Sequence, residues 1–278
     1  MSGLLYIVAT PIGNLSDISE RAVEVLKQVG LIAAEDTRHS KTLLERFGIK
    51  TRVTAYHEHN EEKVTQQLIQ QIQKGESIAL ISDAGTPLIN DPGYNLVVSA
   101  HDNKIQIVPI PGPSAIITAL SASGLPTNKF IYEGYLPAKN KARETRLKEL
   151  KNESRTLVFY EAPHRIVESL KIMQEIFGEQ RRVTIGRELT KQFEQIVRDQ
   201  LSVINKKIEN EEIKQKGEFV VVVEGAKEMA VSDKETLRIN QIIAEKMSPK
   251  EAASLTAKIT GKKKNEVYKL ELDSGKEE

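Results

Sequence analysis

Three loops rich in glycine and proline each follow an apolar stretch in the first half of the chain. They read ATPIGN (9–14), SDAGTPLINDPG (82–93) and PIPGPSA (109–115). Glycine lets backbone approach a ligand closely, and proline fixes the shape of a loop in advance. In an open parallel sheet, loops at the carboxyl ends of the strands form the ligand crevice. Each loop alone could be an ordinary turn, but the three together predict a binding site.

Several known binding motifs are absent, which restricts the classes of ligand that these loops could bind. The first loop is not G-x-G-x-x-G, and the chain contains neither G-x-x-x-x-G-K-[ST] nor H-E-x-x-H. Cysteine is absent, which excludes disulfides, thiol catalysis and cysteine-bound zinc. HEHN (57–60) could in principle bind a metal, but we expect no metal site. The loops suit a polar, roughly neutral ligand better than a triphosphate.

Composition places the chain among ordinary globular proteins. Its 278 residues suggest two domains or one large one. Lys plus Arg number 40 against 39 acidic residues, so any preference for nucleic acid must come from local basic patches. No apolar run approaches the roughly 20 residues that span a membrane, and MSGLLYIVAT does not resemble a signal peptide. We therefore expect a cytoplasmic protein with no membrane partner.

Apolar strands and amphipathic helices alternate in the first half. Strands are predicted at 4–9, 31–34, 77–81 and 104–110, with helices between them, including 37–47 and 94–101. Strands that are apolar throughout indicate a parallel sheet covered on both faces. The prolines of PIPGPSA break regular structure, so residues 1–112 are predicted to form an N-terminal α/β domain.

The second half indicates a different sheet and then a helical segment. Strands are predicted at 129–135, 155–162, 182–189 and 217–225, with helices at 142–150 and 163–176. Residues 113–226 are therefore predicted to form a second α/β domain with a mixed sheet. Residues 227–278 are predicted to be helical and helix-turn-helix-like, with a capping box at Ser248, Pro249 and Glu251. This segment could contact RNA or could only pack on the rest of the protein.

Six motifs in order carry a resemblance to a known family. They are VATPIGNLSDIS, AAEDTRHS, SDAGTPLINDPG, PIPGPSAIITALSASGLP, FYEAPHR and RELTKQFE. Over about residues 4–225 the chain resembles the tetrapyrrole-methylase superfamily, and within it the members that methylate the ribose 2′-hydroxyl of a cytidine in small-subunit (16S) ribosomal RNA. The resemblance implies two α/β domains with S-adenosylmethionine in the cleft between them, a homodimer, and 16S ribosomal RNA, within the small ribosomal subunit, as partner.

The resemblance also implies which residues bind the cofactor. Matching the loops to the family motifs selects Pro11 from the first loop, Asp83, Ala84, Gly85, Thr86 and Ile89 from the second, and Ser114 and Ala115 from the third. Glu161 and Leu189 are the residues expected from the second domain.

Basic side chains in the segments that look like the RNA-methylating members are expected to bind the substrate. These are Arg38, His39, Lys41, His59, Arg165 and Arg187. Such groups can hold phosphates, although each could equally be a solvated charge. Aromatic residues make up only 5% of the chain, which argues against a wide base-stacking platform.

A ribose hydroxyl is a weak nucleophile, so a base that takes its proton would help. Glu35, Asp36, His57, His59 and Asp83 are all possible bases, and we select Asp36 and His57 for the catalytic role. Asp36 could instead form a bidentate ion pair with Arg38 that fixes a loop.

Two other functions remain open. A tetrapyrrole (precorrin or uroporphyrinogen) C-methyltransferase would take up a macrocycle. A non-catalytic RNA-binding factor for ribosome assembly would not need S-adenosylmethionine, so cofactor binding separates this alternative from an enzyme.

Overall fold

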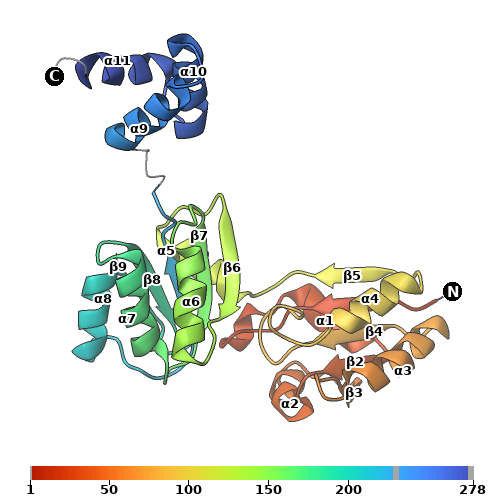
Figure 1. The fold of residues 1–278 in the computed structure, drawn as a ribbon. Helices are drawn as coiled ribbons and strands as arrows, with labels where there is room; N and C mark the ends of the chain where they lie inside the picture. The colour runs from red at the N-terminus through yellow and green to blue at the C-terminus, as the bar shows by residue number, and fades with distance from the viewer. Residues whose placement is uncertain (1, 228–231, 275–278) are drawn as a thin grey trace. The chain divides into compact units, whose positions relative to one another are not determined.

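The protein forms two compact units, divided between Gly225 and Ala226, in a computed structural model that describes residues 2–227 and 232–274 (Figure 1). Parts of the expected first and third segments, residues 1, 228–231 and 275–278, lie outside the described residues. The first unit contains two five-stranded sheets, and the second is helical. The α/β class and the helical C-terminal appendix predicted from the sequence are confirmed.

The first sheet is parallel throughout and has the strand order β3-β2-β4-β1-β5. Its strands are β1 (Leu5–Val8), β2 (Leu31–Ala34), β3 (Arg52–Ala55), β4 (Ile78–Ile81) and β5 (Ile107–Ile110). The central strands β2 and β4 are buried at every position, because helices cover both faces. This explains why they are apolar throughout rather than alternating.

Two helices cover each face of this sheet. Helices α1 (Glu20–Gln28) and α2 (Thr37–Arg46) pack on the face that carries Val8, Ile32 and Ile81. Helices α3 (Glu61–Gln73) and α4 (Tyr94–Asp102) pack on the other face.

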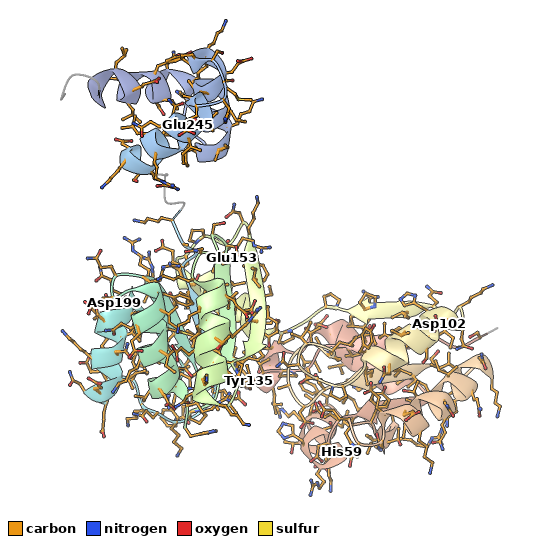
Figure 2. The ribbon with its side chains drawn as sticks, viewed as in Figure 1. His59, Asp102, Tyr135, Glu153, Asp199 and Glu245 are labelled. Atoms are coloured by element: carbon orange, nitrogen blue, oxygen red, sulfur yellow. The ribbon has the colours of Figure 1, made fainter. Side chains whose placement is uncertain are left out.

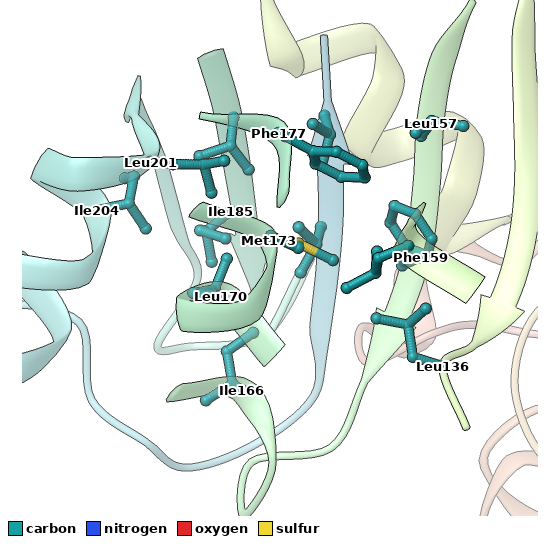
Figure 3. Packing of buried hydrophobic residues seen from close by; sticks show 14 of the residues in the cluster. Leu136, Leu157, Phe159, Ile166, Leu170, Met173, Phe177, Ile185, Leu201 and Ile204 are labelled. Carbon is teal, nitrogen blue, oxygen red and sulfur yellow. The ribbon is translucent and has the colours of Figure 1, made fainter. Parts of the chain in front are cut away.

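The second sheet is mixed and has the order β6-β7-β10-β8-β9, with only β6 and β7 parallel. Its strands are β6 (Phe130–Tyr135), β7 (Thr156–Glu161), β8 (Arg182–Arg187), β9 (Gln195–Gln200) and β10 (Phe219–Val223). Helix α5 (Ala115–Ser123) covers one face. Helices α6 (Asn140–Leu150), α7 (Ile166–Phe177) and α8 (Leu201–Glu209) cover the other, where Leu170 and Met173 of α7 pack near Phe159 and Ile185 (Figure 3).

Sequence patterns missed two of the four edge strands, β3 and β9. Strand β9 alternates between exposed and partly buried residues. Because an edge strand can bury less side-chain surface, it needs fewer apolar residues, and RVTA and QIVRDQ carry no strong apolar pattern. The other edge strands, β5 and β6, were predicted, as were the central strands. Their ends were predicted within two residues, except that β5 begins later, at Ile107.

The C-terminal unit consists of α9 (Asp233–Ala244), α10 (Pro249–Thr260) and α11 (Lys264–Ser274). The predicted capping box is confirmed: the Ser248 hydroxyl accepts from the Glu251 amide, and the Glu251 carboxylate accepts from the Ser248 amide. Gly261, with φ of 71°, ends α10 in the left-handed conformation that favours glycine. Within the described part of the chain, no helix is long and apolar enough to cross a membrane.

Candidate functional site

Backbone hydrogen bonds join the three Gly/Pro loops. The loops follow β1, β4 and β5, which lie next to one another as parallel strands, so all three leave the same edge of the sheet. The Thr10 amide donates to the Gly85 carbonyl at 2.8 Å, and the Gly85 amide donates to the Thr10 carbonyl at 3.0 Å. The Thr86 hydroxyl donates to the Pro113 carbonyl at 3.1 Å. The first and third loops are thus both hydrogen-bonded to the second.

The second loop holds its shape with unusual backbone angles. Gly85 and Gly93 have φ of 86° and 135°, and a Cβ on Gly93 would lie 2.7 Å from the Leu80 side chain. Leu88 and Asn90, which are not glycine, also have positive φ, of 73° and 67°. Strained non-glycine residues of this kind occur most often where a surrounding structure holds a loop for function.

A cavity of about 280 Å³ opens between these loops and the second sheet. Side chains from β6, β7 and β10 and from the segment after β8 form its other wall. The cavity is lined by Ile12, Glu35, Asp83, Ala84, Gly85, Thr86, Ile89, Asn90, Asp91, Ser114, Ala115, Tyr135, Tyr160, Leu189, Glu218, Phe219 and Val220. We call it the first cavity.

Most of the residues predicted to bind the cofactor line this first cavity. Those brought together are Asp83, Ala84, Gly85, Thr86, Ile89, Ser114, Ala115 and Leu189. Pro11 lies instead in a neighbouring second cavity, which shares Ile12, Asp83, Ala84 and Glu218 with the first. Glu161 lines neither cavity.

The carboxylate of Glu161 is occupied elsewhere. It accepts a hydrogen bond from the Ser169 hydroxyl at 2.5 Å and forms an ion pair with Arg165 at 2.8 Å. Successive side chains of a strand point to opposite faces, so the preceding residue on β7, Tyr160, faces the first cavity instead. The prediction was one position away from the residue that the strand presents.

Tyrosine side chains form the aromatic part of the wall. Tyr135, labelled in Figure 2, lies at the end of β6, and its ring centroid is 5.6 Å from that of Tyr160. Tyr132 lies 5.2 Å from Tyr160 and donates its hydroxyl hydrogen to Asn90 at 2.7 Å. Burial is the main cause that raises the pKa of Tyr160 to about 12, so this phenol stays neutral at physiological pH. The electron-rich faces of such rings attract cations.

Carboxylates line the side of the first cavity formed by the loops. The Asp36 amide donates to Asp83 at 3.0 Å, and the Asp83 amide donates to Glu35 at 3.3 Å, which links the loops after β2 and β4. Burial, with neighbouring Glu35 and Asp83, raises the pKa of Asp91 to about 6, although a hydrogen bond with Ser82 opposes the rise. Burial also raises the pKa of Glu35. This negative lining, with backbone amides and tyrosine rings, fits the sulfonium cation of S-adenosylmethionine.

Asp36 has a structural role that reduces its value as a base. Its carboxylate accepts from the Arg38 amide at 2.8 Å, which caps α2, and from the Arg38 guanidinium at 3.2 and 2.9 Å. The hydrogen bonds from Arg38 lower the pKa of Asp36 to about 2. The alternative interpretation of AEDTR, a bidentate ion pair between Arg38 and Asp36, is confirmed. Arg38 and His39 also line the second cavity.

His57 and His59 line neither cavity. They belong to the loop after β3, which is an edge strand separated from β4 by β2. Their rings contact each other edge to face at 5.9 Å (His59 is labelled in Figure 2). The segment still comes near the site, because Glu58 helps to raise the pKa of Glu35 and Glu61 accepts from the Gly93 amide at 3.2 Å. The cavity lining does not support the choice of His57 as a base.

Of the remaining basic residues predicted to bind the substrate, Lys41 is exposed to solvent, and Arg165 and Arg187 make contacts that stabilise the fold. Lys41 is exposed and lies 3.6 Å from Glu45 on the same helix. Arg187 is buried and donates to the carbonyls of Lys216 and Phe193 at 2.7 and 3.1 Å, so its guanidinium holds two loops together. Arg165 pairs with Glu161 and also donates to the Leu136 carbonyl. The structure brings neither Arg165 nor Arg187 into a cavity with Arg38.

Sequence reasoning missed several residues of the first cavity. Asn90 and Asp91 lie inside a motif that was already identified, so the polar pair before Pro92 was the available signal. Tyr135, Tyr160 and Glu218 carried no such signal, because only the folding of the second sheet against the loops brings them to the cavity. Among the described residues, no group of three or more His, Asp or Glu side chains is placed to hold a metal ion.

Comparison with known proteins gives two family matches. Residues 4–205 match the tetrapyrrole (corrin/porphyrin) methylases, and residues 230–274 match the RsmI C-terminal HTH domain. The chain is 49% identical to ribosomal RNA small subunit methyltransferase I of Escherichia coli O157:H7, over 98% of this chain and 95% of the relative. It is 48% identical to the protein of the same name from Pseudomonas aeruginosa, over 98% and 97%.

Solved structures resemble the fold at low sequence identity. A diphthine synthase gives a TM-score of 0.60 at 16% identity, covering 80% of this chain and 90% of that one. A uroporphyrin-III C-methyltransferase from Thermus thermophilus, complexed with S-adenosyl homocysteine, gives 0.55 at 14% identity, covering 80% and 97%. These similarities identify the fold shared with the first unit.

The raised pKa of Asp91 predicts that its ionised form destabilises the fold. The pKa of Asp91 is ordinarily 3.8 and is about 6 in the folded protein. Ionisation of this carboxyl therefore lowers the free energy of unfolding as the pH rises from the first value to the second. One pKa unit is worth about 1.4 kcal/mol before solvent screening, and Asp91 is partly exposed. We expect Asp91→Asn to raise the free energy of unfolding by about 1 kcal/mol at pH 8.

Denaturant unfolding at several pH values tests this prediction. Below pH 4 both the wild type and the variant carry a neutral side chain at position 91, so the difference should disappear there. A variant that is destabilised equally at pH 4 and pH 8 would contradict it.

Proposed function

The chain belongs to the tetrapyrrole (corrin/porphyrin) methylase family, and from that premise we propose that it methylates the ribose 2′-hydroxyl of a cytidine in small-subunit (16S) ribosomal RNA. The cofactor is S-adenosylmethionine. The observation that carries the RNA substrate is near-half identity to ribosomal RNA methyltransferases over almost the whole chain. The match of residues 230–274 to the RsmI C-terminal HTH domain supports it, since the uroporphyrin-III C-methyltransferase structure covers only 80% of this chain.

The residues of the first cavity fit the proposed cofactor. Gly85, Thr86, Ser114 and Ala115 would hold it largely through backbone groups, and the carboxylates would face its positive charge. S-adenosylmethionine supplies an activated methyl group with a built-in leaving group, so positioning supplies much of the acceleration. The chain's own task is to orient the acceptor hydroxyl and take its proton.

Asp83 is better placed for that task than Asp36 or His57. It lines both the first and the second cavity, and so lies where a cofactor in one would meet an acceptor in the other. One carboxylate oxygen accepts from the Asp36 amide, which orients the group. Glu218 also lines both cavities, but it is paired with Lys191 at 2.9 Å and its side chain is 77% exposed. We therefore assign the role of base to Asp83.

An assembled small ribosomal subunit would present the acceptor nucleotide better than free RNA would. An internal nucleotide must leave its stack to enter a cavity, which costs a few kcal/mol unless the substrate already exposes it. The proposed partner is therefore 16S ribosomal RNA within the small ribosomal subunit, acted on in the cytoplasm by a homodimer.

The first test of the proposal concerns Gly85. Alanine at a φ of 86° costs about 1–2 kcal/mol in folding stability, and a methyl group there would lie 3.4 Å from Ile12 at the cavity wall. We expect Gly85→Ala to weaken cofactor binding about tenfold, or ~1.4 kcal/mol. Gly48→Ala is the control, because Gly48 also has positive φ, of 63°, but has no neighbour within 4 Å of the added methyl.

Titration calorimetry with S-adenosylmethionine measures both variants. Equal cofactor affinities for Gly85→Ala and Gly48→Ala would show that the second loop does not contact the cofactor at Gly85.

The second test compares two carboxylates. Asp83→Asn should lower kcat, measured at saturating cofactor, by about 100-fold or more, as expected for loss of a general base. Asp36→Asn should have a much smaller effect, because asparagine also caps helices and the Asp36 carboxylate is held by Arg38. If Asp36→Asn lost the larger part of kcat instead, the assignment to Asp83 would be wrong.

The third test identifies the acceptor. Labelled cofactor is offered with small subunits that lack the modification, with free 16S RNA, and with a porphyrinogen. We expect the label in small subunits, more slowly in naked RNA, and on a cytidine ribose after digestion to nucleosides. Label on a base would retain the RNA substrate but exclude ribose chemistry. Label on the macrocycle alone would establish a tetrapyrrole methyltransferase, and failure to bind the cofactor would favour a non-catalytic factor.

A further inference from the structure

Three neighbouring cavities lie in a row beside the loops. The second cavity, of about 460 Å³, adjoins the first through Asp83, Ala84 and Glu218. A third cavity, of about 500 Å³, shares Gly13 and Lys191 with the second. Each cavity thus has wall residues in common with the next, and we call the row the groove, with the third cavity at its outer end.

One face of α2 forms a wall along this groove. Arg38 and Thr42 line the second cavity, and Arg46 lines the third. These residues are spaced four apart, so they lie on the same side of the helix. Eight residues of α-helix rise about 12 Å, so Arg38 and Arg46 mark two separate points along the groove. Arg46 is exposed, and no ion pair among the described residues involves it.

The loop after β8 supplies the facing wall in a strained conformation. Glu188 and Thr190 have φ of 50° and 66°, although neither is glycine. The Thr190 amide donates to Glu194 at 2.7 Å. The Lys191 ammonium forms ion pairs with Glu188 and Glu218, both at 2.9 Å. These contacts hold Lys191 where the second and third cavities meet.

Charge changes sign along the groove. Carboxylates line the inner part, where Asp83 and Glu218 separate the first two cavities. The third cavity is lined by Arg46 and Lys191, with polar Asn14, Ser16 and Gln192, and by no carboxylate among the described residues. The charge of Lys191 is already balanced by Glu188 and Glu218, so Arg46 is the cation available to a ligand. The guanidinium of Arg46 would therefore attract a phosphate at the outer end, while a neutral hydroxyl could approach the carboxylates.

We infer that the outer groove binds the sugar–phosphate backbone beside the acceptor nucleotide, on single-stranded RNA, with Arg46 contacting a phosphate. This inference rests on the proposed RNA substrate and adds the path of the strand: the acceptor nucleotide in the second cavity and its neighbours in the third. Backbone contacts position a strand without reading its sequence.

Arg46→Gln tests the inference, with Arg46→Lys as a conservative variant. Lys27→Gln is the matched control, because it removes an exposed charge from α1, which packs on the same face of the sheet as α2, and Lys27 lines none of the three cavities. Gln192→Glu adds a negative charge to the third cavity without removing any contact of a charged group. The probes are a short fluorescent oligocytidylate, titrated at several salt concentrations, and small ribosomal subunits that lack the modification, used in steady-state methylation.

Each phosphate contact on single-stranded nucleic acid contributes about 0.7 to the slope of log affinity against log salt. We expect Arg46→Gln to lose about that slope, weaken oligonucleotide binding about fivefold, and raise KM for small subunits without changing kcat. Arg46→Lys should retain the slope, Gln192→Glu should weaken binding, and Lys27→Gln should match the wild type.

The outcomes separate this inference from the proposed function. A wild type that methylates small subunits, with a salt slope unchanged by Arg46→Gln, would overturn the groove alone. Equal losses for Arg46→Gln and Lys27→Gln would also overturn it, because they would indicate a general effect of positive charge rather than a contact at Arg46. A wild type that binds neither probe would overturn both the groove and the RNA substrate.

Discussion

Two reciprocal backbone hydrogen bonds between Thr10 and Gly85 hold the site together. They join loops from neighbouring parallel strands, and they require Gly85 to keep a positive φ. The other contacts between loops around the first cavity are made by residues next to this junction. The Thr86 hydroxyl donates to the third loop, and the Asp83 carboxylate accepts from the loop after β2. The parallel sheet makes the junction possible, since only parallel neighbours end at the same edge.

The second sheet contributes surface rather than loops to the same cavity. Tyr135, Tyr160 and Val220 reach it from strands of the mixed sheet, whose opposite face is a large apolar core formed with α6, α7 and α8. Burial raises the pKa values of Tyr135 and Tyr160 above the ordinary value, at which a phenol is already neutral near pH 7. A cation placed here would meet aromatic faces on one side and carboxylates on the other.

Electrostatics distinguishes the parts of the site more clearly than shape does. The desolvated Glu35 and Asp91 lie beside the first cavity, and the guanidinium of Arg46 lies at the outer end of the groove. Structures with 14–16% identity share the fold of the first unit, so the scaffold alone cannot select between a macrocycle and a nucleic acid. Selection must come from side chains such as those on α2 and on the loop after β8.

The sequence by itself determined the elements and loops that depend on local rules. Buried strands are apolar at every position, the capping box at Ser248 is formed by near neighbours, and the Gly/Pro loops carry their own backbone constraints. Most of the loop residues predicted to bind the cofactor therefore line one cavity. Only the tertiary structure decided the contributions that cross between sheets or along a sheet edge. It placed Tyr160 rather than Glu161 at the cavity, because strand alternation depends on which face the helices cover. It also left His57 outside the lining of both cavities, because strand order, which no local pattern encodes, put β3 at the edge of the sheet.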